Sequence, residues 1–147
     1  MKGAIDLETK QYLGQISRLD RMIKNKMTEL SQYRDLIYGL SAVVNEERVQ
    51  TSPDFDKMSG KVDKILKMES KIDNLIDEYV DKKNLIISQI DSMENETYYE
   101  ILFARYIEKK TFEKIADEMM YSWRQIIRLH GKALQEFEKI YGKTYKK

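Results

Sequence analysis

Three basic side chains recur at every fourth position near the C-terminal end of this 147-residue chain. Arg124, Arg128 and Lys132 lie in the segment from Ser122 to Ala133, which contains no acidic residue. Residues four positions apart project from the same side of an α-helix. Arginine can donate two hydrogen bonds to the edge of a guanine, and both basic residue types neutralise backbone phosphates. The spacing therefore indicates a helix face suited to contact with nucleic acid.

The residues before and along this face have the pattern of two short helices joined by a tight turn. Thr111 is suited to cap the first helix, Met120 and Tyr121 occupy the turn, and Ser122 is suited to cap the second helix. The apolar face of the first helix comprises Phe112, Ile115, Ala116 and Met119. That of the second comprises Ile126, Leu129, Ala133, Leu134 and Phe137. Such a pair predicts a helix-turn-helix, which places its second helix in the major groove of DNA.

Two longer segments with a seven-residue repeat precede this pair. The first runs from about residue 7 to residue 47 and carries Ile16, Ile23, Leu30, Ile37 and Val44, with Tyr12, Leu19, Tyr33 and Leu40 at companion positions. The second runs from about residue 60 to residue 93 and carries Ile65, Ile72, Tyr79, Ile86 and Met93, with Met68 and Leu75 as companions and Val62, Leu66, Ile76 and Ile90 widening the stripe. This repeat is typical of helices that pack along their length.

Turn chemistry around Pro53 predicts a loop at about residues 48–59, so that the two segments fold back as a long antiparallel, coiled-coil-like hairpin. We therefore expect an all-α protein with the hairpin at residues 1–94, a helix-turn-helix domain at 95–141 and a flexible tail at 142–147. Asn95 is expected to cap a helix over about 96–107. A lone hairpin buries little apolar area, which favours a homodimer through the N-terminal helices.

Charge is distributed unevenly, although the formal net charge is only +1. Residues 1–94 carry 15 basic and 17 acidic side chains, whereas residues 95–147 carry 11 and 8. The basic surplus is modest, so a lone monomer is expected to bind DNA weakly and to need a dimer or a protein partner.

Several classes of function lack the residues they need. The chain has no cysteine, which excludes disulfides and thiolate metal sites, and its only histidine is His130. We expect His130 to be a phosphate neighbour or a helix-surface residue, and Asp73, Asp77, Glu78 and Asp81 to form a solvated helix side. No phosphate-binding glycine loop or nucleophile motif is present, so neither enzymatic activity nor a cofactor or metal is expected. No apolar run suggests a membrane span or a secretory signal.

The segment TFEKIADEMMYSWRQIIRLHGKAL, residues 111–134, resembles region 4 of sigma-70-type factors without a gap. More widely, residues from about 11 to 137 resemble a family of small phage and prophage proteins of Gram-positive bacteria, similar to late-gene transcription regulators of the autolysin-regulator type. The segments YLGQISRLDRMIKNKMTEL and RYIEKKTFEKIADEMMYSWRQIIRLHGKAL carry this resemblance. It implies a cytoplasmic protein of the bacterial host that binds double-stranded DNA and has RNA polymerase as a further candidate partner.

The resemblance also implies roles for individual residues. Base contacts fall at Trp123, Arg124 and Arg128, and backbone contacts fall at Lys110, Thr111, Gln125 and Lys132. Trp123 stands where arginine is usual, Arg124 where glutamate is usual, and Ile127 where a basic residue is usual, so the promoter −35 specificity of sigma factors is not transferred. Trp123 and Ile127 have two interpretations: contact with thymine methyls or sugars, or docking against the hairpin or a polymerase subunit.

Three functions compete on these observations. The leading hypothesis is a sequence-specific transcription regulator of phage type that reads the major groove with residues 122–134. The second is a DNA-packaging component, because small terminase subunits also combine a helix-turn-helix with helical hairpins. The third is a module that binds polymerase without binding DNA.

Overall fold

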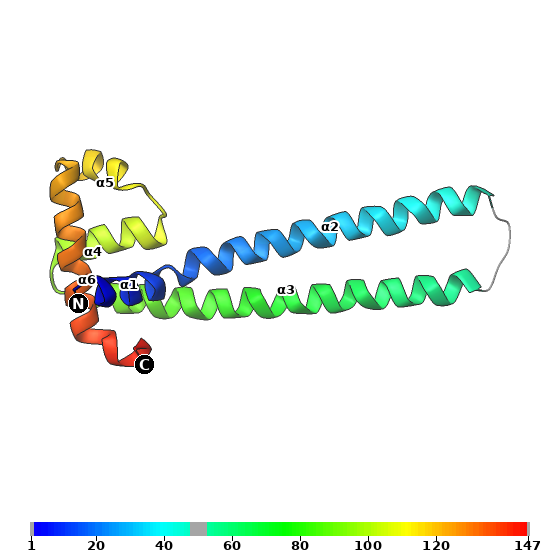
Figure 1. Ribbon diagram of the computed structural model, residues 1–147, viewed down its shortest axis with the longest axis horizontal. Coiled ribbons are helices and arrows are strands. Elements are labelled where there is room, and N and C mark those ends of the chain that lie inside the picture. Colours follow the sequence, from blue (N-terminus) through cyan, green and yellow to red (C-terminus); the bar gives the residue numbers. More distant parts are fainter. Residues whose placement is uncertain (1, 48–52, 147) are drawn as a thin grey trace. The chain divides into compact units, whose positions relative to one another are not determined.

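The computed structural model describes residues 2–47 and 53–146, with side chains described over 7–39 and 57–146. These residues form helices and connecting turns, without a strand among them, so the predicted all-α class is confirmed (Figure 1). The elements are α1 (Lys2–Leu13), α2 (Gln15–Glu47), α3 (Pro53–Asp91), α4 (Glu96–Leu102), the π-helix η1 (Phe103–Ile107), α5 (Phe112–Met119) and α6 (Trp123–Tyr145).

The helices assemble into two compact units. Unit 1 comprises Met1–Arg18 and Tyr79–Lys147, and unit 2 comprises Leu19–Glu78. The division differs from the sequence-based boundary near residue 94, because the first helix and the last turns of α3 pack with the C-terminal helices. The heptad pattern did not signal this division, since its buried positions continue through both units.

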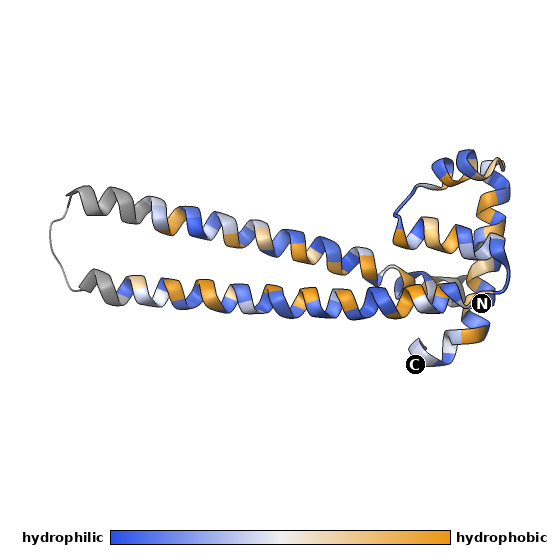
Figure 2. Ribbon diagram, turned by 180° about the vertical axis from the view of Figure 1, so that it is seen from behind, coloured by the Kyte–Doolittle hydropathy of each residue, from blue (hydrophilic) through white to orange (hydrophobic). Residues whose placement is uncertain are grey.

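Unit 2 is built from parts of α2 and α3 that pack against each other. One cluster of its buried side chains comprises Leu30, Ile37, Ile65 and Ile72, and Leu19 and Ile23 are buried as well; all of them stand at predicted heptad positions. An ion pair between Arg34 and Glu69 bridges the two helices. Hydrophobic residues recur along both helices between hydrophilic ones (Figure 2). Val62, Leu66 and Ile76, predicted to widen the buried stripe, are instead exposed, because two helices share only one seam. The predicted positions Leu40 and Val44 lie outside the described side chains.

The core of unit 1 surrounds Phe137, which is completely buried. The other buried members of this core are Tyr12, Leu13, Ile16, Ile86, Ile90, Met93, Leu102, Ala133 and Leu134. The Tyr12 hydroxyl donates a hydrogen bond to Gln89 Oε1 at 2.6 Å, which gives the hydroxyl and the amide oxygen a partner. The first helix is thereby joined to α3 and α6 by apolar and polar contacts together.

The segment predicted as a flexible tail, residues 142–147, is helical as far as Tyr145. Helix α6 continues to Tyr145, whose ring stacks on that of Tyr12 with a centroid distance of 4.3 Å. The Tyr145 hydroxyl lies 2.9 Å from Thr9 Oγ1. Aromatic burial against α1 therefore holds a segment that its basic and polar composition suggested would be free.

Two helix boundaries also differ from prediction. Residues 53–59 were predicted to lie in the loop but belong to α3. The fixed φ of Pro53 suits the first position of a helix. The rest of the predicted loop, residues 48–52, lies outside the described residues. The first predicted helix is interrupted at Gly14. A Cβ at this position would lie 2.9 Å from the Lys10 carbonyl oxygen, so only glycine fits without a backbone shift.

Substituting two glycines should separate this packing requirement from helix propensity. Gly39, in α2, has open space around a built Cβ, so Gly39→Ala should stabilise the protein by about 0.5–1 kcal/mol. Gly14→Ala should lower the thermal midpoint, because the added methyl meets backbone rather than a movable side chain. Thermal unfolding followed by circular dichroism measures both. A Gly14→Ala protein as stable as Gly39→Ala would contradict the close approach.

Candidate nucleic-acid interface

Helix α4 and the π-helix η1 pack beneath the candidate interface and position α5 and α6. Asn95 caps α4 as predicted, its side chain accepting a hydrogen bond from the Tyr98 N–H at 3.1 Å. The helix then widens into η1, where the Glu108 N–H donates to the Phe103 carbonyl at 3.0 Å. π turns re-aim the side chains that they carry. Here the turn positions Ala104, Arg105 and Tyr106 against α5 and α6.

Helix α5 begins at the predicted cap, where Thr111 Oγ1 accepts a hydrogen bond from the Lys114 N–H at 3.2 Å. Its inner face is as predicted, with Ile115 and Ala116 buried and Phe112 and Met119 packed beside them. The same cluster includes Ile126 of α6 together with Ile101 and Ala104. The small side chain of Ala116 allows α5 and α6 to approach closely at this point.

The connection between α5 and α6 is short and closely hydrogen-bonded. Met120 adopts a left-handed conformation with φ 60° and ψ 38°, and the Tyr121 N–H donates to the Ala116 carbonyl at 2.9 Å. Ser122 caps α6 as predicted: its Oγ accepts from the Gln125 N–H at 3.1 Å. Gln125 Oε1 in turn accepts from the Ser122 N–H at 2.9 Å, completing a capping box. Gln125, predicted to contact the DNA backbone, thus has a structural role at this cap.

All the predicted contact residues except Lys110 and Thr111 lie on the first three turns of α6. Arg124, Arg128 and Lys132 are all exposed, and within the described part of the chain no ion pair or hydrogen bond to their side chains occurs. Trp123, the first residue of the helix, is 52% exposed, whereas Ile127 is half-buried. The arrangement leaves three cations free to meet anionic oxygen or base edges.

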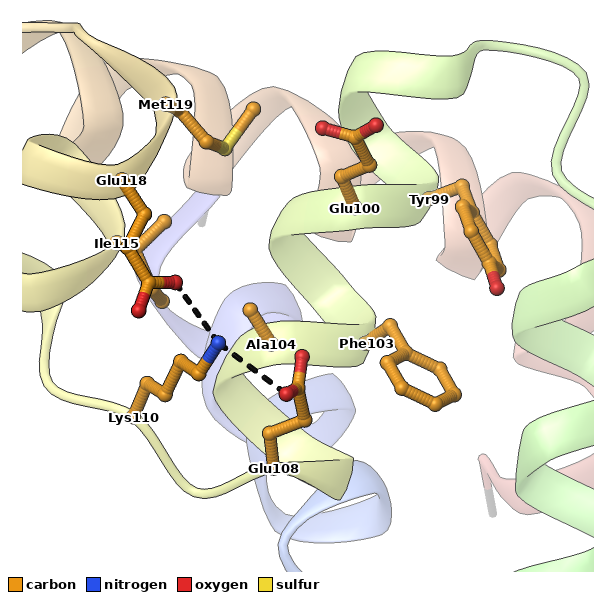
Figure 3. A pocket seen from close by; sticks show the side chains of 9 residues that line it. All are labelled: Tyr99, Glu100, Phe103, Ala104, Glu108, Lys110, Ile115, Glu118 and Met119. Atoms are coloured by element: carbon orange, nitrogen blue, oxygen red, sulfur yellow. Dashed lines mark hydrogen bonds and ion pairs between the residues drawn. The ribbon is translucent and has the colours of Figure 1, made fainter.

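Lys110 has a different environment from the other predicted contacts. Its Nζ lies 2.7 Å from Glu118 Oε2 and 3.1 Å from Glu108 Oε2, at the edge of a groove of about 240 Å³ (Figure 3). Hydrogen bonds to Glu118 and then Glu108 raise the pKa of Lys110, and Lys110 lowers the pKa of Glu118. Two carboxylates already compensate this cation, so a phosphate contact would have to compete with both of them.

His130 is a core residue, which corrects the prediction of a phosphate neighbour or surface position. Its exposed fraction is 4%, and its Nε2 lies 2.8 Å from the Tyr106 hydroxyl. The Phe112 ring contacts it edge-on at a centroid distance of 4.8 Å. Burial, followed by the nearby charges of Lys10 and Arg105, lowers the pKa of His130 to about 4. The ring is therefore neutral at pH 7 and serves packing between η1, α5 and α6.

Sequence reasoning missed the partners of His130 because they depend on the π turn. Arg105 places its guanidinium carbon 4.0 Å from the centre of the Phe112 ring and donates from Nη1 to the Lys110 carbonyl at 3.0 Å. Tyr106, the next residue, reaches His130. A regular α-helix points successive side chains in different directions, so its periodicity did not predict that Arg105 and Tyr106 both contact this part of the core.

Other kinds of site lack support in the described residues. They contain no group of three or more potential ligands that could hold a metal ion. None of the described helices combines the length and apolar character needed to cross a membrane.

Comparison with known proteins gives one family. A family model described as "Protein of unknown function (DUF1492)" matches residues 41–138, which is more than half of the chain and includes α5 and most of α6. No curated protein gives a significant match, and no solved structure gives one.

The buried imidazole makes stability depend on pH. Between about pH 6.5 and 4 the unfolded chain binds a proton at His130 that the folded chain does not. The free energy of unfolding should therefore fall as pH falls through this window, by at most about 3–4 kcal/mol. Urea unfolding at about pH 7 and about pH 5, with wild type and His130→Phe, measures this dependence. Equal pH slopes for the two proteins would show that His130 does not titrate in this way.

Proposed function

We propose that this chain, which belongs to the DUF1492 family, binds duplex DNA sequence-specifically and regulates transcription. The observation that carries the proposal is the exposed row of Arg124, Arg128 and Lys132, on a stretch of α6 without an acidic residue. Folding of this helix does not require three exposed basic side chains without an acidic partner on one of its faces. Polyanions such as DNA do attract such a face.

The proposed mode of binding is that of a helix-turn-helix. Helix α5 crosses the DNA backbone and the first turns of α6 enter the major groove. Arg124 and Arg128 each contact a guanine edge, Lys132 contacts a phosphate, and Thr111 contacts a phosphate near the start of α5. The three-residue connection, the capping box at Ser122 and the close packing at Ala116 support this mode. Trp123 is the remaining proposed base contact.

The transcriptional part of the proposal rests on the resemblance of residues 111–134 to region 4 of sigma-70-type factors. The wider resemblance supports a phage or prophage regulator that acts in the bacterial cytoplasm and contacts RNA polymerase. The N-terminal helices are the proposed dimerisation or polymerase-contacting part. Exposed apolar side chains on unit 2, among them Leu36 and Leu66, are consistent with a protein partner there.

Removal of one arginine should weaken specific binding without unfolding the protein. Arg128→Ala should reduce affinity for a selected duplex by about 5- to 150-fold, as expected from the loss of one two-pronged guanine contact of ~1–3 kcal/mol. Arg21→Ala, which removes an exposed arginine from unit 2, is the matched control and should bind normally. Mobility-shift titrations at two salt concentrations measure both variants. Equal affinity of the two variants, or binding insensitive to salt, would contradict the proposal.

Assembly state separates regulation from the alternative of DNA packaging. A transcription regulator should sediment as a monomer or a dimer. In a two-fold dimer both subunits use the same surface for the contact, so no further subunit is added. A packaging component of the small terminase type should form a ring of many subunits. Sedimentation velocity of the full chain over a range of concentrations distinguishes them, and a stable ring would favour packaging over regulation.

A further inference from the structure

The turn before α6 presents apolar side chains to solvent rather than to the core. We define the apolar tip as Met120, Tyr121 and Trp123, of which Met120 is 91% exposed and Trp123 is 52% exposed. Soluble proteins expose single apolar residues routinely. Three such large side chains within four residues, at the start of a helix that carries a free cationic row, form a local concentration of them.

Hydrogen bonds hold the backbone of the apolar tip, so its exposure is not that of a loose loop. The Tyr121 N–H is bonded to the Ala116 carbonyl, and the capping box at Ser122 fixes the residue that precedes Trp123. Met120 is held in the left-handed region, where a side chain costs about 1–2 kcal/mol relative to the ordinary helical conformation. Glycine would avoid that cost. Stability alone therefore does not account for a large apolar residue at this turn.

The position of Trp123 relative to the arginines suggests what the apolar tip meets. Trp123 immediately precedes Arg124, and the pair is repeated one turn later by Ile127 and Arg128. An apolar row thus runs beside the cationic row on α6. In the major groove the thymine C5-methyl is the apolar feature of a base edge, whereas guanine presents two acceptors. The two rows match these two kinds of base edge.

We propose that Trp123 is a specificity-determining residue that recognises thymine through its C5-methyl group. This inference rests on the proposed binding of α6 in the major groove. The flat, rigid indole offers apolar area at little conformational cost, as aromatic side chains do at binding surfaces. Its fixed place beside Arg124 puts the recognised thymine next to a guanine read by the arginine row.

Exchanging thymine for deoxyuridine tests the proposal, because it removes the methyl group and leaves the hydrogen-bonding edge unchanged. The duplex is first selected with the full-length protein from random DNA, and each thymine is then replaced in turn. We expect the dissociation constant of the wild type to rise about three- to fourfold at one or two thymines, the effect of one buried methyl group. Trp123→Ala should bind the thymine duplex more weakly and should not respond to the exchange at those positions. Titrations at low salt keep weak complexes measurable.

The matched control is Ile140→Ala, which removes another half-exposed apolar side chain from α6, about 25 Å further along the helix. It should retain the wild-type affinity and the response to deoxyuridine. If Trp123→Ala and the base exchange change the dissociation constant independently of each other, the inference is overturned, although the proposed DNA binding still stands. Unchanged DNA binding by Trp123→Ala would overturn it as well, because it would show that the indole does not contact DNA. If the wild type selects no DNA sequence and binds without salt dependence, the proposed function itself fails.

Discussion

Burial of Ile126 is the constraint on which the candidate interface depends. This side chain is completely buried in a cluster with Ile115 and Ala116 of α5, Ile101 of α4 and Ala104 of η1. Because successive residues of an α-helix turn by about 100°, one fixed position sets the rotation of the whole first part of α6. Residues two before and two after Ile126 must then point away from the core. Arg124 and Arg128 occupy those two positions, so the direction of the cationic row follows from an apolar contact on the opposite side.

Polar as well as apolar contacts join η1 to α5 and α6 in unit 1. The π turn brings Arg105 over the ring of Phe112 in α5 and Tyr106 to His130 in α6. A buried polar group is stable only when it has a hydrogen-bonding partner, so Tyr106 and His130 constrain each other's position. These contacts tie η1 to the same stretch of α6 that carries the cationic row. The position of α6 is therefore fixed both by the hydrogen bond between Tyr106 and His130 and by the packing of Ile126.

Much of this architecture could be read from local sequence signals. The heptad residues such as Ile37 and Ile72, the caps at Asn95, Thr111 and Ser122, and the apolar faces of α5 and α6 report short-range geometry, and the structure confirms them. Features that depend on distant partners could not be predicted in the same way. The burial of His130 requires a π turn without a periodic signature, and the order of residues 142–145 requires a tyrosine more than a hundred residues away. The role of Lys110 likewise depends on carboxylates that fold next to it.

Helix α6 separates residues that determine the fold from residues that face solvent. Ile126, Ala133 and Phe137 are constrained by packing, and Ser122 and Gln125 by the cap. Trp123, Arg124 and Arg128 have none of these constraints, because their side chains face solvent. Substitution at exposed positions changes stability little, so such residues can diverge while the scaffold is retained. Under the proposed function, these exposed residues are therefore the ones that can set a DNA preference without a change of fold.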